Sequence, residues 1–466
     1  MNNKVFKLTT IIALSMFLFN GCATDDLEPT LAQDKPVEGS ITSVGNLFSI
    51  LKGAHSQMTS GGYYGQAMII TNEVRSDNCF SNGYSGRYST QAEYAYNENT
   101  GYVWDNAYQV IANANIIINQ SLDGLSGDLA YGSHIQGQAT GLRALAHFDL
   151  LRSFGQQHTG GSLGVPIITQ FKDESNLFPA RNTVDEVKAA IYADLEAAFT
   201  MMDVAYDSKI YFSKYAAKAL ESRVAVYFGD WPRARDAAME VLGSGMYTIA
   251  PAGSFVSNWG SKQAGNSIFE LQNSASDNAG IGGLAYIYRW PTFPATGYGD
   301  IQVVDNVYAL FEATDVRRDI LGYQLEATGA TPSLRNMGKY PDTVSYTDNI
   351  PLMRIEEVIL NYAEALFEIN NADPAALTQL NSITSNRGAS AHASVTKQII
   401  LDERRKELMF EGFRFDDLVR TGESIDVLGS IQNVIQTLTY PNNLFAYPIP
   451  KAETDANSNM VQNAGY

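Results

Sequence analysis

The sequence predicts a mainly all-α protein, built as a scaffold of helical repeats that carries its ligand face on long irregular loops. Pairs of short amphipathic helices joined by tight turns are expected near 213–243 and 352–384, and such pairs build helical repeats of about 34 residues. Two stretches rich in glycine and aromatic residues, about 59–100 and 253–350, interrupt this helical pattern. Loops of that length inside a compact domain usually carry function.

The individual helices follow from apolar periodicity and from their start signals. A first helix is expected over 44–58, followed by Val103–Ser121 and 137–154. Thr183-Val-Asp-Glu186 is a capping box, in which a hydroxyl and a carboxylate satisfy free amides at a helix start. The clearest buried stripe repeats at alternating steps of three and four residues: Leu352, Ile355, Ile359, Tyr362, Leu366 and Ile369.

Composition excludes several classes of function. The chain has 466 residues, 45% hydrophobic content and a formal net charge of −18, which argues against nucleic-acid binding and against electrostatic adhesion to anionic lipid. Its five histidines lie far apart without ligand spacing, so we expect neither a metal site nor a cofactor. The two cysteines, Cys22 and Cys79, do not resemble a disulfide framework, and we expect Cys79 to be a buried thiol.

The amino terminus predicts export and lipidation. Residues 1–21 combine a basic start, a short apolar run and a small residue before Cys22, which is the pattern of a lipoprotein signal peptide. We expect Cys22 to be acylated and residues 22–40 to form a flexible tether. The remaining residues, 41–466, are expected to form a single domain that stays outside the lipid.

The carboxyl-terminal stretch Leu401–Gly422 mixes charges closely with aromatic residues. On a continuous helix, Arg404 would meet Glu407 three residues on and face Glu411 two turns on. Charges placed among so many apolar residues predict a partly buried ion network, because unpaired charges are too costly to bury.

Within this stretch, Glu403–Arg420 resembles the carboxyl-terminal signature of the SusD/RagB family, which comprises nutrient-binding outer-membrane lipoproteins. Leu142–Arg152, Ser213–Leu220, Met353–Ala365 and the ending Pro448–Tyr466 resemble further blocks of the same family. The resemblance covers essentially the whole mature chain apart from the loops. It implies a tetratricopeptide-like fold and a SusC-like TonB-dependent transporter as partner. It also implies an outer-membrane location facing the cell exterior.

The two aromatic stretches supply the candidate ligand residues, because sugar rings lie flat on aromatic faces and their hydroxyls bind Asp, Asn and Arg. The candidate stacking faces are Tyr84, Tyr88, Tyr286 and Trp290. The candidate polar partners are Asp77, Asn78 and Arg289. Packing of these aromatics onto the scaffold stays open as an alternative. Ligand residues of the family share no motif in such loops, so none is transferred by position.

These observations favour a cell-surface protein that captures an oligosaccharide or polysaccharide and hands it to the transporter. The alternative is a peptide ligand, as the RagB branch of the family implies. A glycoside hydrolase is disfavoured, because no carboxylate pair stands out with the spacing that such catalysis needs. A purely structural scaffold is disfavoured by the aromatic loops. We therefore predict a binding protein and not an enzyme.

Overall fold

The computed structural model describes residues 40–289, 297–325, 332–427 and 436–466. The expected signal peptide, Cys22, most of the tether and the candidate residue Trp290 lie outside the described residues. Over the described part, none of the helices has both the length and the apolar character that crossing a membrane requires.

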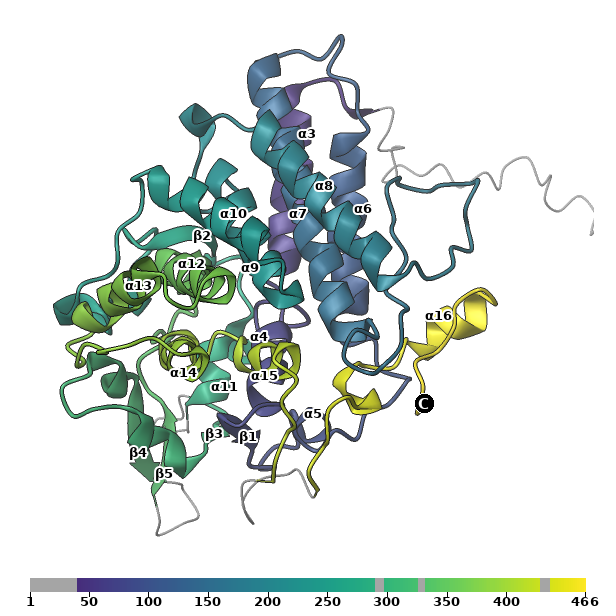
Figure 1. Cartoon of the computed structure of the whole chain (residues 1–466). Helices are drawn as coiled ribbons and strands as arrows, with labels where there is room; N and C mark the ends of the chain where they lie inside the picture. Colours follow the sequence, from purple (N-terminus) through teal and green to yellow (C-terminus); the bar gives the residue numbers. More distant parts are fainter. Residues whose placement is uncertain (1–39, 290–296, 326–331, 428–435) are drawn as a thin grey trace, which may run out of the picture. The chain divides into compact units, whose positions relative to one another are not determined.

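The scaffold consists of helices that each pack on their neighbours in the chain (Figure 1). Its helices are α3 Val44–Met58, α6 Trp104–Ile118, α7 Leu129–Phe154, α8 Val184–Met201, α9 Lys214–Phe228, α10 Trp231–Gly243, α12 Ile355–Ile369 and α13 Pro374–Ser385. Helix α7 lies between α6 and α8, and α10 packs on both α9 and α12. The prediction of a mainly helical, tetratricopeptide-like scaffold is confirmed.

Helix α7 begins earlier than the predicted range of 137–154. The carboxylate of Asp128 accepts hydrogen bonds from the amides of Ala130 and Tyr131, which fixes the start of the helix. Glycine obscured this part of the pattern, since it has a low helix propensity. The structure gives Gly141 a packing role, because a side chain there would collide with the ring of Phe212.

The two aromatic stretches contain short strands and helices as well as irregular loops. The remaining α-helices are α4 Ala67–Val74, α5 Ser89–Ala92 and α11 Leu284–Tyr288, which lie in these stretches, and α14 Lys397–Leu408, α15 Arg414–Arg420 and α16 Lys451–Ala456, which follow them. The strands are β1 Cys79–Ser81, β2 Ser267–Leu271, β3 Ile301–Val303, β4 Leu321–Leu325, β5 Pro332–Asn336 and β6 Ile350–Arg354. They pair antiparallel as β1–β3, β2–β6 and β4–β5. Cys79 is buried in β1, as expected.

The charged stretch near the carboxyl terminus folds as two helices and not as one. After α14 the backbone turns at Phe410 and Gly412, whose φ angles are +70° and +80°, and α15 follows. The predicted pairing of Arg404 with Glu407 and Glu411 is therefore wrong. Arg404 instead donates to Asp417 at 3.1 Å, because the turn brings α15 back beside α14.

The predicted ion network exists and joins distant parts of the chain. Glu407 accepts hydrogen bonds from Arg387 at 2.9 Å and from Arg354 at 3.1 Å. Glu411 accepts from Arg354 at 2.9 Å and from Lys339 at 2.6 Å. All of these side chains are at least 95% buried. The network fixes α14 against β6 and the end of α13.

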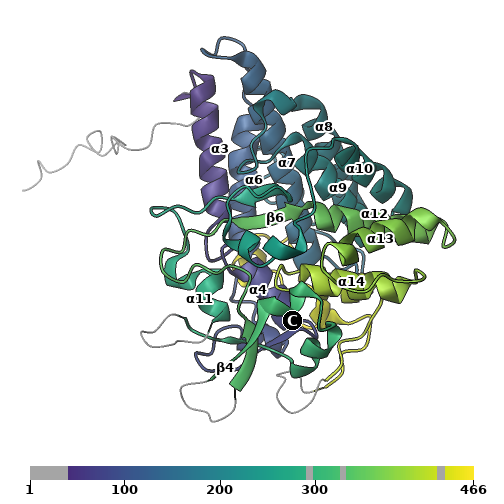
Figure 2. The same ribbon diagram turned by 90° about the vertical axis from the view of Figure 1, so that its left-hand side faces the viewer.

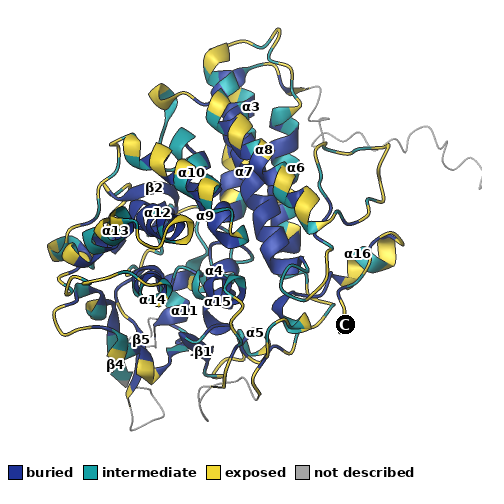
Figure 3. Ribbon diagram, viewed as in Figure 1, coloured by how far each residue is buried: buried dark blue, intermediate teal, exposed yellow. Residues whose placement is uncertain are grey.

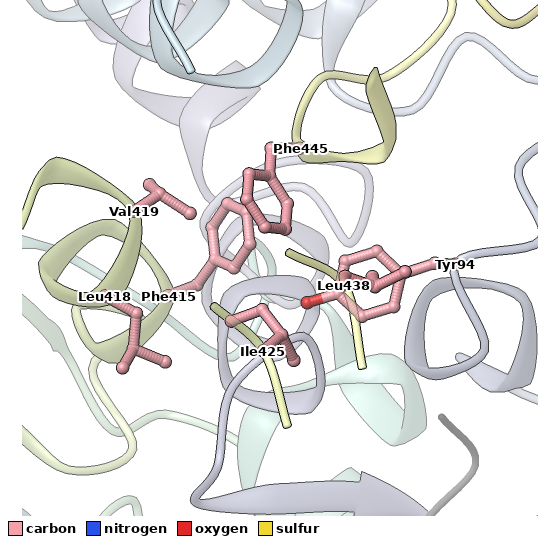
Figure 4. Packing of buried hydrophobic residues seen from close by; sticks show 7 residues of the cluster. All are labelled: Tyr94, Phe415, Leu418, Val419, Ile425, Leu438 and Phe445. Atoms are coloured by element: carbon pink, nitrogen blue, oxygen red, sulfur yellow. The ribbon is translucent and has the colours of Figure 1, made fainter. Parts of the chain in front are cut away.

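A hydrophobic cluster attaches the first aromatic stretch to the carboxyl-terminal part of the chain. Figure 4 shows its residues, Tyr94, Phe415, Leu418, Val419, Ile425, Leu438 and Phe445. Colouring by burial shows the inner faces of the scaffold helices buried, while exposed residues gather on the loops and on the outer helix faces (Figure 3). The loop region is therefore anchored on the same core as the helices.

Candidate functional site

Pairing of β1 with β3 brings the two aromatic stretches side by side. Cys79 pairs with Val303 and Ser81 with Ile301, so the loop that follows β1 lies beside the segment that precedes β3. Asn82 continues the ladder, because its amide donates to the carbonyl of Asp300 at 2.9 Å. In Figure 1 the β1–β3 pair lies close to β5 and α11, both of which pack on β3. Figure 2 shows the region from the side, with α11 above β4.

Arg87 joins the two loops through charge and ring contacts. Its guanidinium carbon lies 3.7 Å from the ring centroid of Tyr298, and its Nη1 donates to Ser85 at 2.8 Å. Ser85 in turn donates through its amide to the Asp300 carboxylate at 3.2 Å. Asp300 is fully buried, so it acts as an internal anchor for the loop.

Three tyrosines continue this surface away from Arg87. The ring of Tyr286 meets that of Tyr298 edge to face, with centroids 4.9 Å apart. On its other side Tyr286 meets Tyr346 at 6.0 Å. All three are half-buried, so each keeps part of its ring accessible. Such rings offer apolar faces with hydroxyl groups on the rim.

Tyr84 and Tyr88 occupy the loop on the β1 side of this surface. Tyr84 is 60% exposed and lies between Gly83 and Gly86, whose φ angles are +72° and +78°. Glycine adopts such angles without strain and so lets the loop turn sharply. Tyr88 is half-buried. Burial, with the nearby groups of Tyr447 and Asp300, raises the pKa of Tyr88 well above its usual value.

The three polar residues singled out in the sequence are engaged inside the protein. The carboxylate of Asp77 accepts from Arg414 at 2.6 and 2.8 Å. Although burial opposes its ionisation, Arg414 and Arg405 hold the pKa of Asp77 below its usual value. Asn78 is fully buried and accepts from Arg405 at 2.8 Å. The structure therefore gives Asp77 and Asn78 the role of docking α14 and α15 onto the loop.

Arg289 also has an internal role. It is 7% exposed, and its guanidinium donates to the backbone carbonyls of Tyr340 at 2.6 Å and Met337 at 3.0 Å. Burial lowers the pKa of Arg289 to about 10. These contacts hold the segment that leads to Tyr346 against the end of α11, so Arg289 supports the aromatic surface from beneath.

The structure thus links Tyr286, one of the sequence candidates, through Tyr298 and Arg87 to the loop that carries Tyr84 and Tyr88, and it adds Arg87, Tyr298 and Tyr346 to the candidates. Tyr298 and Tyr346 both lie in the second aromatic stretch, and Arg87 directly precedes a candidate, so local composition could have found all three. We call the set Tyr84, Arg87, Tyr286, Tyr298 and Tyr346 the aromatic surface.

Chemically, this surface suits the recognition of rings that have one apolar face and hydroxyl groups at the edge. Arg87 supplies donors and the tyrosine hydroxyls can both donate and accept. Within the described ranges, histidine, cysteine, aspartate and glutamate form no group that could hold a metal ion. The fold and this surface define a helical-scaffold protein with a loop-built aromatic face.

Comparison with known proteins places the chain in a family. The SusD family model matches residues 335–466, and a model described as starch-binding associating with outer membrane matches residues 31–226. A SusD-like protein of Formosa agariphila is 24% identical over 99% of this chain and 100% of its own length. The starch-binding protein SusD of Bacteroides thetaiotaomicron is 35% identical over 27% of this chain and 22% of its own length.

Solved structures agree with this assignment. A SusD superfamily protein from Bacteroides thetaiotaomicron superposes with a TM-score of 0.83 and 27% identity, over 90% of this chain and 99% of its own. The chain is a member of the SusD-like family.

Proposed function

We propose that this protein binds neutral oligosaccharides on the aromatic surface at the outside of the cell. The observation that carries the proposal is the β1–β3 pairing, which places Arg87 on the ring of Tyr298 and next to the Tyr286–Tyr346 pair. The descriptions of the matching family model and of the Bacteroides thetaiotaomicron relative as starch-binding support a carbohydrate ligand. The net charge of −18 disfavours an acidic glycan.

We further propose that the protein is anchored in the outer membrane through lipid on Cys22 and passes its ligand to a SusC-like TonB-dependent transporter. The amino-terminal pattern and the description of the family as associating with the outer membrane support this. In labelling with a fatty acid, the wild-type protein is expected to take up the label and Cys22→Ala to lose it. Uptake of the label by the Cys22→Ala variant would contradict a lipid anchor on Cys22.

Calorimetry tests the binding proposal with a panel of neutral oligosaccharides and short peptides. Tyr286→Ala and Tyr84→Ala are each expected to weaken glycan binding about tenfold, on the order of 1.4 kcal/mol, because a stacking face is lost. Tyr323→Ala is the matched control, since Tyr323 on β4 is 55% exposed, close to the 60% of Tyr84. Its binding should equal that of the wild type.

Three outcomes would overturn this reasoning. Binding of peptides alone would move the protein to the peptide-binding alternative and make the tyrosines packing residues. Release of shortened sugars during incubation with the pure protein, followed by chromatography, would show hydrolysis and contradict the proposal that the protein binds without catalysis. Equal loss in Tyr323→Ala would mean that the variants act through general destabilisation.

A further inference from the structure

A groove apart from the aromatic surface is lined by residues of α6, of the segment 166–179 and of α16. Its volume is about 650 Å³, which falls within the range typical of ligand sites. Nothing in the proposed use of the aromatic surface requires it.

The segment that forms one wall of this groove is fastened on both sides. Towards α6, the Tyr108 hydroxyl donates to the carbonyl of Pro166 at 2.9 Å, and Asn115 donates to Ile168 at 3.0 Å. Beyond α16, Asn457 donates to the carbonyl of Pro179 at 2.8 Å. Hydrogen bonds on both sides therefore hold this wall in place and set the width of the groove.

Its lining combines apolar and polar groups. Leu177 and Phe178 are adjacent and 65% and 57% exposed, so they offer apolar faces at its rim. Among the residues that the structure describes, the side chains of Asp105, Gln109 and Asn176 make no hydrogen bond with another protein group, and all three line the groove. Free amides and carboxylates beside apolar faces match the hydroxyls and CH faces of a sugar.

The charge of the lining narrows the chemical class of the ligand. Asp105, Asp173 and Glu453 line the groove, whereas Lys172 is its one lining cation among the described residues. Burial raises the pKa of Glu453, although a hydrogen bond from Trp104 opposes the shift, and the charge of Asp105 raises it further. A further negative charge would be repelled here, so the lining disfavours an anionic ligand.

A second hollow adjoins this groove and is lined in part by Tyr88, from the loop that also carries Tyr84 and Arg87. It has a volume of about 290 Å³ and shares Asp105 with the groove. Its lining includes Tyr88, Tyr102 and Tyr447, of which the last two stack with centroids 4.3 Å apart. Tyr447 is 2% exposed, and its hydroxyl has no hydrogen-bond partner within the described residues. Tyr88 lies in the loop of the aromatic surface, directly after Arg87.

We propose that the hollow and the groove form a track that holds further units of a neutral glycan chain whose end lies on the aromatic surface. This inference rests on the proposed carbohydrate-binding function and specifies that the preferred ligand is a chain of several units. The track predicts that affinity rises with chain length, because additional units reach Asp105, Gln109 and Asn176.

The test compares trisaccharides with heptasaccharides of the malto-, cello-, xylo- and manno-series by calorimetry. The series that binds should show higher affinity for the heptasaccharide. The variant Asp105→Ala/Gln109→Ala is expected to lower heptasaccharide affinity about tenfold through two lost hydrogen bonds, and to leave trisaccharide affinity unchanged. Asn176→Ala, on the exposed segment, should act in the same direction.

The matched control is Gln398→Ala/Asp402→Ala, which removes the same two residue types four positions apart on the exposed face of α14. It should leave both affinities unchanged. If the trisaccharide binds but neither length nor the groove variants matter, the track is refuted while the proposed function stands. If no oligosaccharide binds, both the track and the proposed carbohydrate-binding function are refuted. If a glycine–serine heptapeptide binds in a way that depends on Asp105 and Gln109, the ligand class is wrong.

Discussion

Replacing the buried carboxyl of Glu73 should change how the stability of the protein depends on pH. Glu73 is fully buried in α4, where it accepts from the Gly412 amide at 2.9 Å and from Asn78 at 3.4 Å. Burial raises the pKa of Glu73 from 4.5 to about 7, although these hydrogen bonds and the charge of Lys339 act against the shift.

The sign of the effect follows from the raised pKa. Below about pH 4.5 the carboxyl is protonated in both the folded and the unfolded state. As the pH rises through about 7, the unfolded chain ionises freely but the folded chain must ionise a buried group, so stability is lost. A shift from 4.5 to about 7 corresponds to a loss on the order of 3 kcal/mol, complete above about pH 8.

Glu73→Gln keeps an acceptor for Gly412 and removes the titration. Its free energy of unfolding in urea, relative to the wild type, should therefore rise by about 3 kcal/mol between pH 4.5 and pH 8. Glu240→Gln, on the exposed face of α10, is the control and should show no such rise. A constant difference between Glu73→Gln and the wild type across this range would refute the assignment.

Three further predictions concern packing and charge. Gly141→Ala should lower the free energy of unfolding by about 1–3 kcal/mol, because the added methyl group collides with Phe212. Gly53→Ala, on an open face of α3, should raise it by about 0.5–1 kcal/mol. Urea unfolding measures both free energies, and equal effects of the two variants would contradict the close approach of Gly141 and Phe212. Arg387→Met should cost about 3–5 kcal/mol by removing one of the cationic partners of two buried glutamates, Glu356 and Glu407. A cost near zero in the same assay would show that this part of the ion network is dispensable. Although burial opposes the shift, the charges of Arg420 and Arg404 lower the pKa of Glu364 from 4.5 to about 2. The stability that Glu364 contributes should therefore be present above about pH 4.5 and be lost towards pH 2. Glu364→Gln should lose less stability than the wild type over that interval, and an equal loss would refute the pKa assignment.

The scaffold could be predicted largely from the sequence, because its signals are local. The predicted 44–58 coincides with α3, and the pairs near 213–243 and 352–384 correspond to α9–α10 and α12–α13. The start of α7 and the break after α14 were missed. Glycine within a helix weakens the periodic pattern, and the left-handed turn at Phe410 leaves no trace in it.

The binding region could be predicted only as a region. Glycine and aromatic composition indicated the loops, and the β1–β3 pairing joined them. The roles of individual polar residues depend on partners far away in the chain: Asp77 meets Arg414 across 337 positions, and Asn78 meets Arg405 across 327. No spacing rule within the loop could indicate that these side chains are already occupied.

The buried ion network also bears on the order in which the protein is synthesised. Arg354 and Arg387 leave the ribosome before Glu407 and Glu411, to which they are bound in the finished fold. Until those glutamates emerge, the two arginines share the one carboxylate of Glu356, so burying both would leave a net positive charge in the core. The core around β6 and α14 is therefore expected to close only after α14 has been translated, so a nascent chain that ends before α14 should remain open and accessible to protease.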